Sequence, residues 1–283
     1  MADVDLSELK PDALAPAAVE AKAEKLDVGK ANMPVGKAFL SSILAGMFIG
    51  MGGMFMLLVK SDSTLTFAAS SLLGGLAFAL GLFLVITAGS ELFTGNCLMI
   101  MGKMSSKYSW GKLLKSWLVV WVGNFCGALI LIFLLYFGNF YGMNGGAVGA
   151  TMLTVAAGKI APSWSVLFFK GIMCNILVCL AVWVGFSART VVDKFFTVLL
   201  PIIAFVACGF EHCVANMFFL PMGLVIKSAG VVNVANITAN IDVITLAGVF
   251  KNISAATLGN IVGGCIFVGV IYWLIYAKKG SQK

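Results

Sequence analysis

The chain has 283 residues, of which 60% are hydrophobic and only 11% are charged. A soluble domain carries roughly a quarter of its residues as charged ones, so this composition excludes a soluble globular protein. It favours a polytopic α-helical membrane protein. The formal net charge of +7 does not indicate nucleic-acid binding, because the lysines and arginines lie mostly in short loops and tails.

The N-terminal segment, residues 1–34, is expected to stay outside the membrane. It holds seven of the twelve Asp and Glu residues and lacks the apolar stretch of a secretory signal peptide. The part from Ala13 to Ala31 is rich in Ala, Glu and Lys, which favours helix. We therefore expect a solvated cytoplasmic helix lying at the membrane surface.

Six apolar stretches follow, and each continuous one supplies the ~20 residues that are needed to cross ~30 Å of hydrocarbon. The second and the fifth stretch are interrupted by glycine and polar residues. The predicted spans are Phe39 to Val59, Phe67 to Met101 (interrupted at 89–96), Leu113 to Phe137, Trp164 to Phe186, Phe195 to Ile226 (interrupted at 209–216) and Ala255 to Ala277. The predicted transmembrane domain is residues 35–278, followed by a cytoplasmic tail, 279–283.

Six crossings place both termini on the same side of the membrane. The number of cations on each side then predicts which side is the cytoplasm. Fourteen lysines and arginines lie on the side of the termini, and four lie on the other side: Lys60, Lys159, Lys227 and Lys251. The positive-inside rule then makes both termini cytoplasmic. The remaining cation, Lys170, lies inside the fourth span; its amino group either reaches the membrane interface or attracts anions in an outer vestibule.

Two motifs occur twice in the same order. Glu91-x-x-x-x-Asn96 in the second span matches Glu211-x-x-x-x-Asn216 in the fifth, and Gly123-Asn124 in the third matches Gly259-Asn260 in the sixth. Each half of the chain is thus a unit of three spans, an odd number, so the second half enters the membrane from the opposite side. This pattern predicts an all-α fold of two inverted repeats, about residues 35–140 and 160–278, with broken second and fifth helices.

The paired interruptions indicate a transport pathway. Non-helical backbone at membrane depth is tolerated only where it is buried in protein or lines a water-filled cavity, and the helix N-termini at a break suit an anion. Ionisable residues inside spans are by default functional, here His212, Glu211 and Glu91. The alternative is that His212 is a hydrogen-bonded core residue and that each Glu accepts free N–H groups of its own broken helix.

The residues of the two interruptions and of the repeated motifs resemble those of the formate/nitrite transporter family, and the resemblance extends from about Ala13 to Ala277. Leu92-Phe93-Thr94-Gly95 is similar to the family's loop in the second span, the segment 171–183 to its fourth-span signature and the segment 209–217 to its fifth-span break. The resemblance implies a homopentamer of aquaporin-like protomers in the cell membrane, each with its own pore for small monovalent anions and with no cofactor or metal.

The resemblance also implies roles for single residues. His212 would face the permeating anion, with Thr94 opposite it on the loop that also carries Phe93. The N-terminal helix resembles the family's segment that moves against the cytoplasmic mouth. The apolar constrictions would be Leu82, Leu92, Val178 and Phe205, and the polar network behind the histidine would comprise Lys159, Asn175 and Glu211, with Asn260 in the sixth-span Gly-Asn motif.

Formate and nitrite are weak-acid anions, and an apolar constriction opposes a bare charge far more than a neutral acid. His212 would therefore donate a hydrogen bond or a proton at the narrowest point. The anion would pass as the neutral acid or with a compensating proton, which makes protons a second partner. Passage would then depend on pH.

The substrate stays open between two branches of the family. Ala161-Pro162 and the segment 167–171 look more like nitrite channels, whereas the segments 216–218 and 221–223 look more like formate channels. Hydrosulfide and larger monocarboxylates are further alternatives, and a proton-coupled carrier fits the inverted repeat as well as a channel does.

Other classes of protein fit less well. An aquaporin-like channel for neutral solutes lacks support, because Asn-Pro-Ala occurs nowhere in the chain. An enzyme would need a nucleophile and base or a set of metal ligands, and the chain has one histidine. The seven cysteines lie in apolar segments, where we expect buried small hydrophobic residues.

Overall fold

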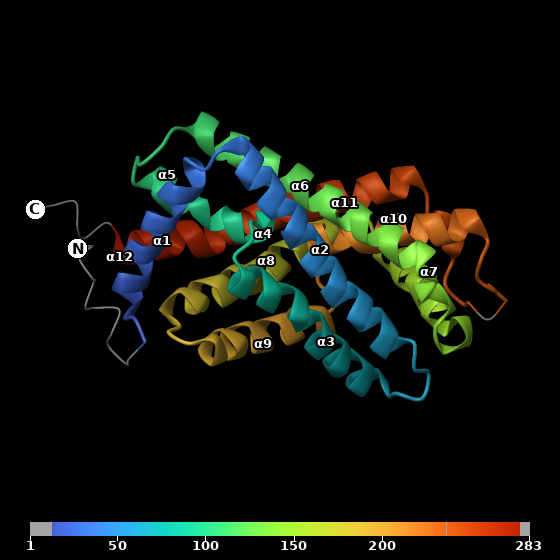
Figure 1. Ribbon diagram of the computed structural model, residues 1–283. Coiled ribbons are helices and arrows are strands. Elements are labelled where there is room, and N and C mark those ends of the chain that lie inside the picture. Colours follow the sequence, from blue (N-terminus) through green and yellow to red (C-terminus); the bar gives the residue numbers. More distant parts are fainter. Residues whose placement is uncertain (1–12, 236, 278–283) are drawn as a thin grey trace, which may run out of the picture.

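The computed structural model describes residues 13–235 and 237–277, and all regular elements in this part of the chain are helical (Figure 1). Five helical stretches in it are long and apolar enough to cross a membrane. They are α2 (Val35–Lys60), α3 (Phe67–Ala88), α6 (Trp110–Phe137), α8 (Trp164–Ser187) and the stretch Leu246–Tyr276, which comprises α11 (Leu246–Val262), a π-helical segment (Gly263–Val270) and α12 (Ile271–Tyr276).

Shorter helices complete the bundle. They are α1 (Pro16–Ala31), α4 (Phe93–Asn96), α5 (Ile100–Met104), α7 (Ala147–Ile160), α9 (Val191–Ala207) and α10 (Cys213–Ala229), with 3-10 turns at Cys97–Met99, Phe140–Gly142, Asn144–Gly146 and Ile241–Val243. The predicted fifth span corresponds to α9 and α10, which have 17 residues each.

Short polar side chains start four of the five long helical stretches, all except α2. Thr66, Ser109, Ser163 and Thr245 each accept a hydrogen bond from the backbone N–H three residues downstream. Thr190 does the same in a capping box with Asp193. These residues satisfy donors that a helix start leaves free, and so they fix where each helix begins.

Glycines allow the helices to approach closely. Helix α2 packs against α3 and α6, and α8 packs against α9 and α11. A Cβ atom at Gly127 would lie 2.0 Å from the carbonyl oxygen of Ile43, and one at Gly259 would lie 2.2 Å from that of Phe168. The small residues at these crossings therefore let two backbones touch, as in tightly packed membrane helices.

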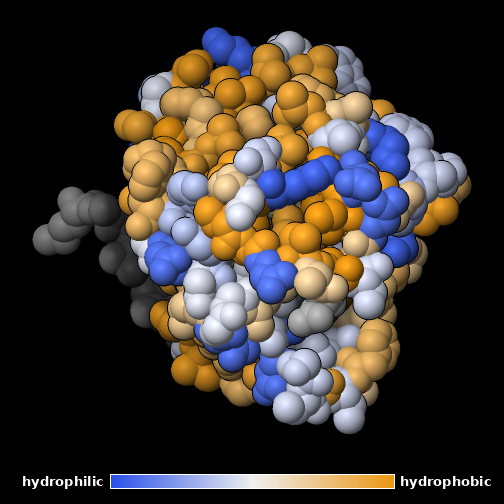
Figure 2. All heavy atoms as spheres, turned by 90° about the vertical axis from the view of Figure 1, so that its right-hand side faces the viewer, coloured by the Kyte–Doolittle hydropathy of each residue, from blue (hydrophilic) through white to orange (hydrophobic). Residues whose placement is uncertain are grey.

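The sides of the bundle are apolar and its end is polar. Large side chains such as Leu118, Leu200 and Phe250 are exposed on α6, α9 and α11. Figure 2, which looks at the end of the bundle that lies at the right of Figure 1, shows hydrophilic side chains gathered over that end with apolar atoms around them. This distribution suits a protein whose sides face lipid and whose ends face water.

Two interruptions divide helices near the middle of the bundle. Helix α3 ends at Ala88, Gly89 takes a left-handed conformation (φ 77°) and helix resumes at Phe93. Helix α9 ends at Ala207, and helix resumes at Cys213. In this second interruption Gly209 is left-handed (φ 66°). Both breaks leave backbone groups without helical partners in apolar surroundings.

One buried asparagine bridges the first break. The side-chain oxygen of Asn124 accepts from the N–H of Phe93 at 2.9 Å. Its amide nitrogen donates to the carbonyl oxygens of Ser42 at 2.8 Å and of Glu91 at 2.9 Å. A single side chain of α6 therefore ties the start of α4 to the loop before it and to α2.

Asn260 of α11 makes the same three bonds at the second break. Its oxygen accepts from the N–H of Cys213 at 2.9 Å, and its nitrogen donates to the carbonyl oxygens of Gly171 and Glu211, both at 2.8 Å. Asn260 and Asn124 are both fully buried. The repeated Gly-Asn motif of the sequence thus has the same structural task in both halves of the chain.

The N-terminal helix α1 packs against α5 and α8 rather than being solvated all round. It buries Val19 and Ala23 together with two carboxyl groups, Glu20 and Asp27. Asp27 accepts a 3.4 Å hydrogen bond from the N–H of Gly102. Burial raises the pKa of Asp27 to about 8, and burial together with the neighbouring Glu24 raises the pKa of Glu20 to about 7.

Three sequence expectations need correction. The helix that contains the predicted sixth span begins at Leu246, before Ala255, and accommodates the charged Lys251: its amino group donates to two backbone carbonyl oxygens at 2.6 and 2.9 Å. The stretch between the third and fourth spans contains a helix, α7, which was not predicted. Cys208 is exposed and Cys126 is half-buried, so not all cysteines are buried.

Replacing Asn260 by Leu keeps the branching at Cγ but leaves the carbonyl of Glu211 and the N–H of Cys213 without partners. Each unsatisfied buried group costs about 1–3 kcal/mol, so we expect the unfolding temperature of the purified protein to fall by several degrees. Asn233→Ala, in an exposed loop, is the matched control and should leave the unfolding temperature unchanged. An Asn260→Leu protein as stable as the control would show that the bridge is dispensable.

Docking of α1 should weaken as the pH rises. In the docked helix the pKa of Asp27 lies above its ordinary value of 3.8. The contribution of Asp27 to the stability of docking is therefore fully present below about pH 4 and is lost as the pH rises through about 8. Hydrogen-exchange protection factors of residues 16–31 should therefore fall between pH 6 and pH 9, and Asp27→Asn combined with Glu20→Gln should remove most of that change, because the pKa of Glu20 is raised as well. Equal protection at both pH values in the unmodified protein would contradict this reading; Asp62→Asn, in an exposed loop, is the control.

Candidate functional site

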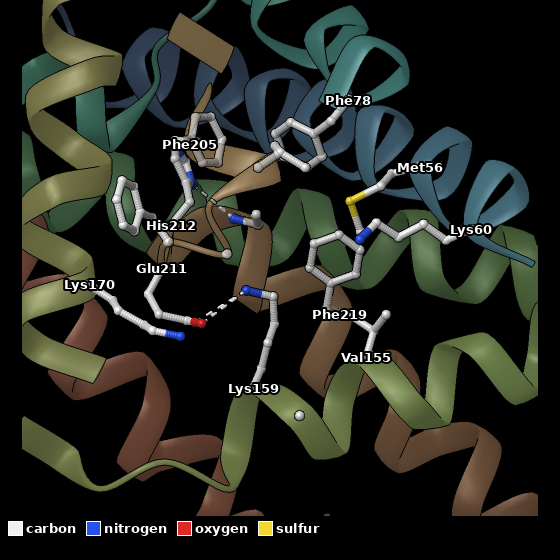
Figure 3. Close-up of a pocket in the computed structure, with 15 residues that line it drawn as sticks. Met56, Lys60, Phe78, Val155, Lys159, Lys170, Phe205, Glu211, His212 and Phe219 are labelled. Atoms are coloured by element: carbon white, nitrogen blue, oxygen red, sulfur yellow. Dashed lines mark hydrogen bonds and ion pairs between the residues drawn. The ribbon is translucent and has the colours of Figure 1, made fainter. Parts of the chain in front are cut away.

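Two cavities approach the centre of the bundle from opposite ends. The first, here the α7 cavity, has a volume of about 230 Å³ and is lined by Phe78, Phe205 and His212 and by three lysines, Lys60, Lys159 and Lys170 (Figure 3). The second, here the α1 cavity, has a volume of about 280 Å³, and its lining includes Leu82, Leu92, Glu91, Asp27 and Lys30. The buried residues between the cavities decide what can pass from one to the other.

His212 and Thr94 meet at the inner end of the α7 cavity. The imidazole Nε2 lies 3.0 Å from the hydroxyl oxygen of Thr94, and the Nδ1 atom accepts a 3.1 Å hydrogen bond from the N–H of Ala215. Because Nδ1 is an acceptor, a neutral ring carries its proton on Nε2 and donates toward Thr94. Both side chains are buried, and each stands at one of the two helix breaks.

The backbone of Thr94 is held from behind. Asn175 of α8 donates to the carbonyl oxygen of Thr94 at 3.2 Å and to that of Asn260 at 2.7 Å. The Cys179 thiol lies 3.4 Å from the same Thr94 oxygen. Asn175 therefore connects the two breaks, which explains why a polar residue stands in the middle of an apolar helix.

Glu211 forms a buried polar cluster beside His212. Its carboxylate accepts from the amino group of Lys159 at 3.3 Å, from Asn216 at 2.6 Å and from Asn252 at 3.1 Å. Asn252 in turn donates to the carbonyl oxygen of Lys159 at 2.7 Å. The charge of Glu211 is thus fully compensated, as a charge buried at this depth requires.

Glu91 has an equivalent cluster at the first break. Asn96 donates to its carboxylate at 2.8 Å, as Asn216 does to Glu211. The cation is Lys30 of α1, whose amino group lies 3.2 Å from Glu91 and 2.5 Å from the Asn96 oxygen. Each break therefore has a Glu–Asn pair with one lysine, and at the first break that lysine belongs to the N-terminal helix α1.

The apolar residues singled out in the sequence are all buried, but they do not share one wall. Leu82 and Leu92 line the α1 cavity. Phe205 lines the α7 cavity, with its ring stacked on His212 (ring centroids 5.9 Å apart). Val178 lines neither cavity. Phe93 also lines neither, and its ring packs edge-on against Trp117.

Several functional contacts were not expected from the sequence. The two repeated motifs include Asn96, Asn124 and Asn216, but they did not predict which groups these side chains would bind. No sequence pattern indicated a contact for Lys30, because the N-terminal segment lies outside the repeat. Asn252 follows a charged residue and was placed before the sixth span. In the part of the chain that the structure describes, no three His, Cys, Asp or Glu side chains are placed to hold a metal ion.

Comparison with known proteins identifies the family of the chain. The family model described as formate/nitrite transporter matches residues 17–274. The formate channel FocA of Escherichia coli strain K12 is 37% identical over 277 residues, which cover 96% of this chain and 97% of that protein. The nitrite transporter NirC of Salmonella typhimurium is 33% identical over 258 residues, covering 89% of this chain and 87% of that protein.

A solved structure described as a pentameric formate channel with formate bound is also similar. It is 41% identical in sequence and superimposes with a TM-score of 0.78, covering 86% of this chain and 98% of that one. The protein is therefore a multi-pass membrane protein, and the chain belongs to the formate/nitrite transporter family.

Proposed function

We propose that this protein is a membrane channel for small monovalent weak-acid anions, formate before nitrite, in which His212 makes passage depend on pH. The observation that carries the proposal is the His212–Thr94 pair, buried where the two cavities approach each other. Each cavity is lined by at least one lysine side chain and by apolar ones, phenylalanine in the α7 cavity and leucine in the α1 cavity.

The apolar side chains set the energetic problem. A carboxylate that leaves the lysines of the α7 cavity would meet the rings of Phe78 and Phe205, which line the same cavity and pack edge-on against each other. Moving a bare charge into such surroundings is far more costly than moving a neutral acid. A proton that joins the anion at this point removes most of that cost.

The imidazole is oriented to assist at this step. Its Nε2–H points toward Thr94 and can exchange that partner for an oxygen of the anion, while Nδ1 stays bonded to the Ala215 N–H. A hydrogen bond to a charged group contributes about 1.5–3 kcal/mol. The Thr94 hydroxyl provides a second donor on the opposite side.

The proposed architecture follows the repeat. Six crossings in two inverted halves of about 35–140 and 160–278 would place residues 1–34 and 279–283 in the cytoplasm. The α7 cavity would then be the outer vestibule and the α1 cavity the inner one. A homopentamer in the cell membrane is supported by the solved formate channel, described as pentameric. No enzymatic step is required.

Formate is favoured over nitrite by the relatives. Identity to the FocA formate channel of Escherichia coli is 37%, against 33% to the NirC nitrite transporter. Nitrite is the second candidate, because it has the same charge and a similar size and its transporter belongs to the same family. The residues at the centre would treat the two anions alike.

Replacing His212 by Phe should reduce formate flux into proteoliposomes by about tenfold or more, which corresponds to one lost hydrogen bond to a charged group. His212→Asn keeps a donor and a helix-capping oxygen but cannot carry a proton, so flux should fall and any flux that remains should no longer depend on a titrating group at position 212. Flux of formate and nitrite across a pH series measures both effects. Normal pH-dependent uptake by the Phe variant would contradict the central role of His212.

A further inference from the structure

The α7 cavity carries more positive charge than its polar cluster can neutralise. Its charged lining residues are Lys60, Lys159, Lys170 and Glu211. Glu211 is already engaged by Lys159 and two asparagine side chains. In residues 13–235 and 237–277, no hydrogen bond or ion pair is found for the amino groups of Lys60 and Lys170.

The two lysines come from different parts of the fold. Lys60 is the last residue of α2, and Lys170 lies in the second turn of α8. Figure 3 shows them on opposite sides of Lys159, with the amino end of Lys170 toward Glu211 and that of Lys60 beside the Phe219 ring. The backbone oxygen of Lys170 accepts from the N–H of Glu211 at 3.4 Å, which fixes this part of α8 beside the break.

This arrangement decides between the two roles considered for Lys170. A lysine that only reached toward the membrane interface would direct its amino group away from the bundle. Lys170 instead lines the cavity and is half-buried there. Half-buried ammonium groups without a protein partner are favourable only if an anion or water compensates them.

Resting on the proposed function, we propose that Lys60 and Lys170 form an anion-loading site in the outer vestibule, which holds a small monovalent anion before it reaches Phe78 and Phe205. The cavity volume of about 230 Å³ has room for a formate-sized anion and several waters, since one water takes up about 30 Å³ in the liquid. Lys159 alone cannot supply this site, because its charge is spent on Glu211.

The electrostatic potential inside the α7 cavity can be measured without a transport assay, and it tests the loading site. Gly158 lines the same cavity, and a Cβ atom there meets nothing within 4 Å, so Gly158→Cys places a thiol on the wall at no steric cost. With the exposed Cys208 changed to Ser, the rates of modification by an anionic and a cationic methanethiosulfonate reagent are compared on the full-length protein.

We expect the anionic reagent to react faster, and the ratio of the two rates to fall by about fivefold or more in Lys60→Gln/Lys170→Gln. That change corresponds to the loss of two charges within roughly 10 Å of the thiol in a largely aqueous cavity. Lys60→Arg/Lys170→Arg should keep the ratio. Lys227→Gln removes a charge at the end of α10, outside this cavity, and should leave the ratio unchanged.

A second measurement links the site to transport. The formate concentration that gives half-maximal uptake into proteoliposomes should rise several-fold in the double Gln variant, and the difference should shrink in high salt. A thiol-rate ratio that does not respond to the two substitutions would overturn the loading site. So would an unchanged half-saturating concentration in a protein that transports formate. A lowered ratio in a protein that carries no formate would support the site and overturn the proposed substrate.

Discussion

The structure depends on how two interrupted helices satisfy their backbone groups in apolar surroundings. Unpaired N–H and C=O groups at membrane depth cost several kcal/mol each, and a break is stable only if the protein supplies the missing partners. Asn124 and Asn260 supply three hydrogen bonds each, with the same geometry at both breaks. Because these bonds fix the breaks, Thr94 and His212 come to lie 3.0 Å apart at the point where the two halves meet.

Charged side chains around this centre fall into two groups, carboxylates that are compensated and lysines that are not. The two carboxylates next to the breaks, Glu91 and Glu211, are each held by one asparagine of their own helix and by one lysine. They are neutralised and so do not repel an approaching anion. Two further cations, Lys60 and Lys170, line the α7 cavity without a hydrogen-bond or ion-pair partner among the described residues. An anion would thus meet positive charge first, then apolar side chains and then the hydrogen-bond donors of the centre.

Much of this could be predicted from the sequence, because helix breaks in apolar segments and a repeated motif are local signals. The spacing of Glu91 and Asn96, repeated at Glu211 and Asn216, predicted both breaks, and the structure has them at those residues. The proximity of His212 and Thr94 came from resemblance to a family, because residues 118 positions apart leave no local pattern. Lys30 could not be found, since its contact with Glu91 depends on how α1 docks. Helix α7 was missed because its Ala- and Gly-rich segment is shorter than a membrane span.

If the anion crosses the His212–Thr94 region together with a proton, formate and proton uptake must be coupled. Both can be recorded in the same proteoliposomes under an imposed membrane potential. We expect one proton to enter with each formate, at a rate that is insensitive to the potential. Formate entry without protons, at a rate that follows the potential, would show instead that the bare anion crosses the apolar region.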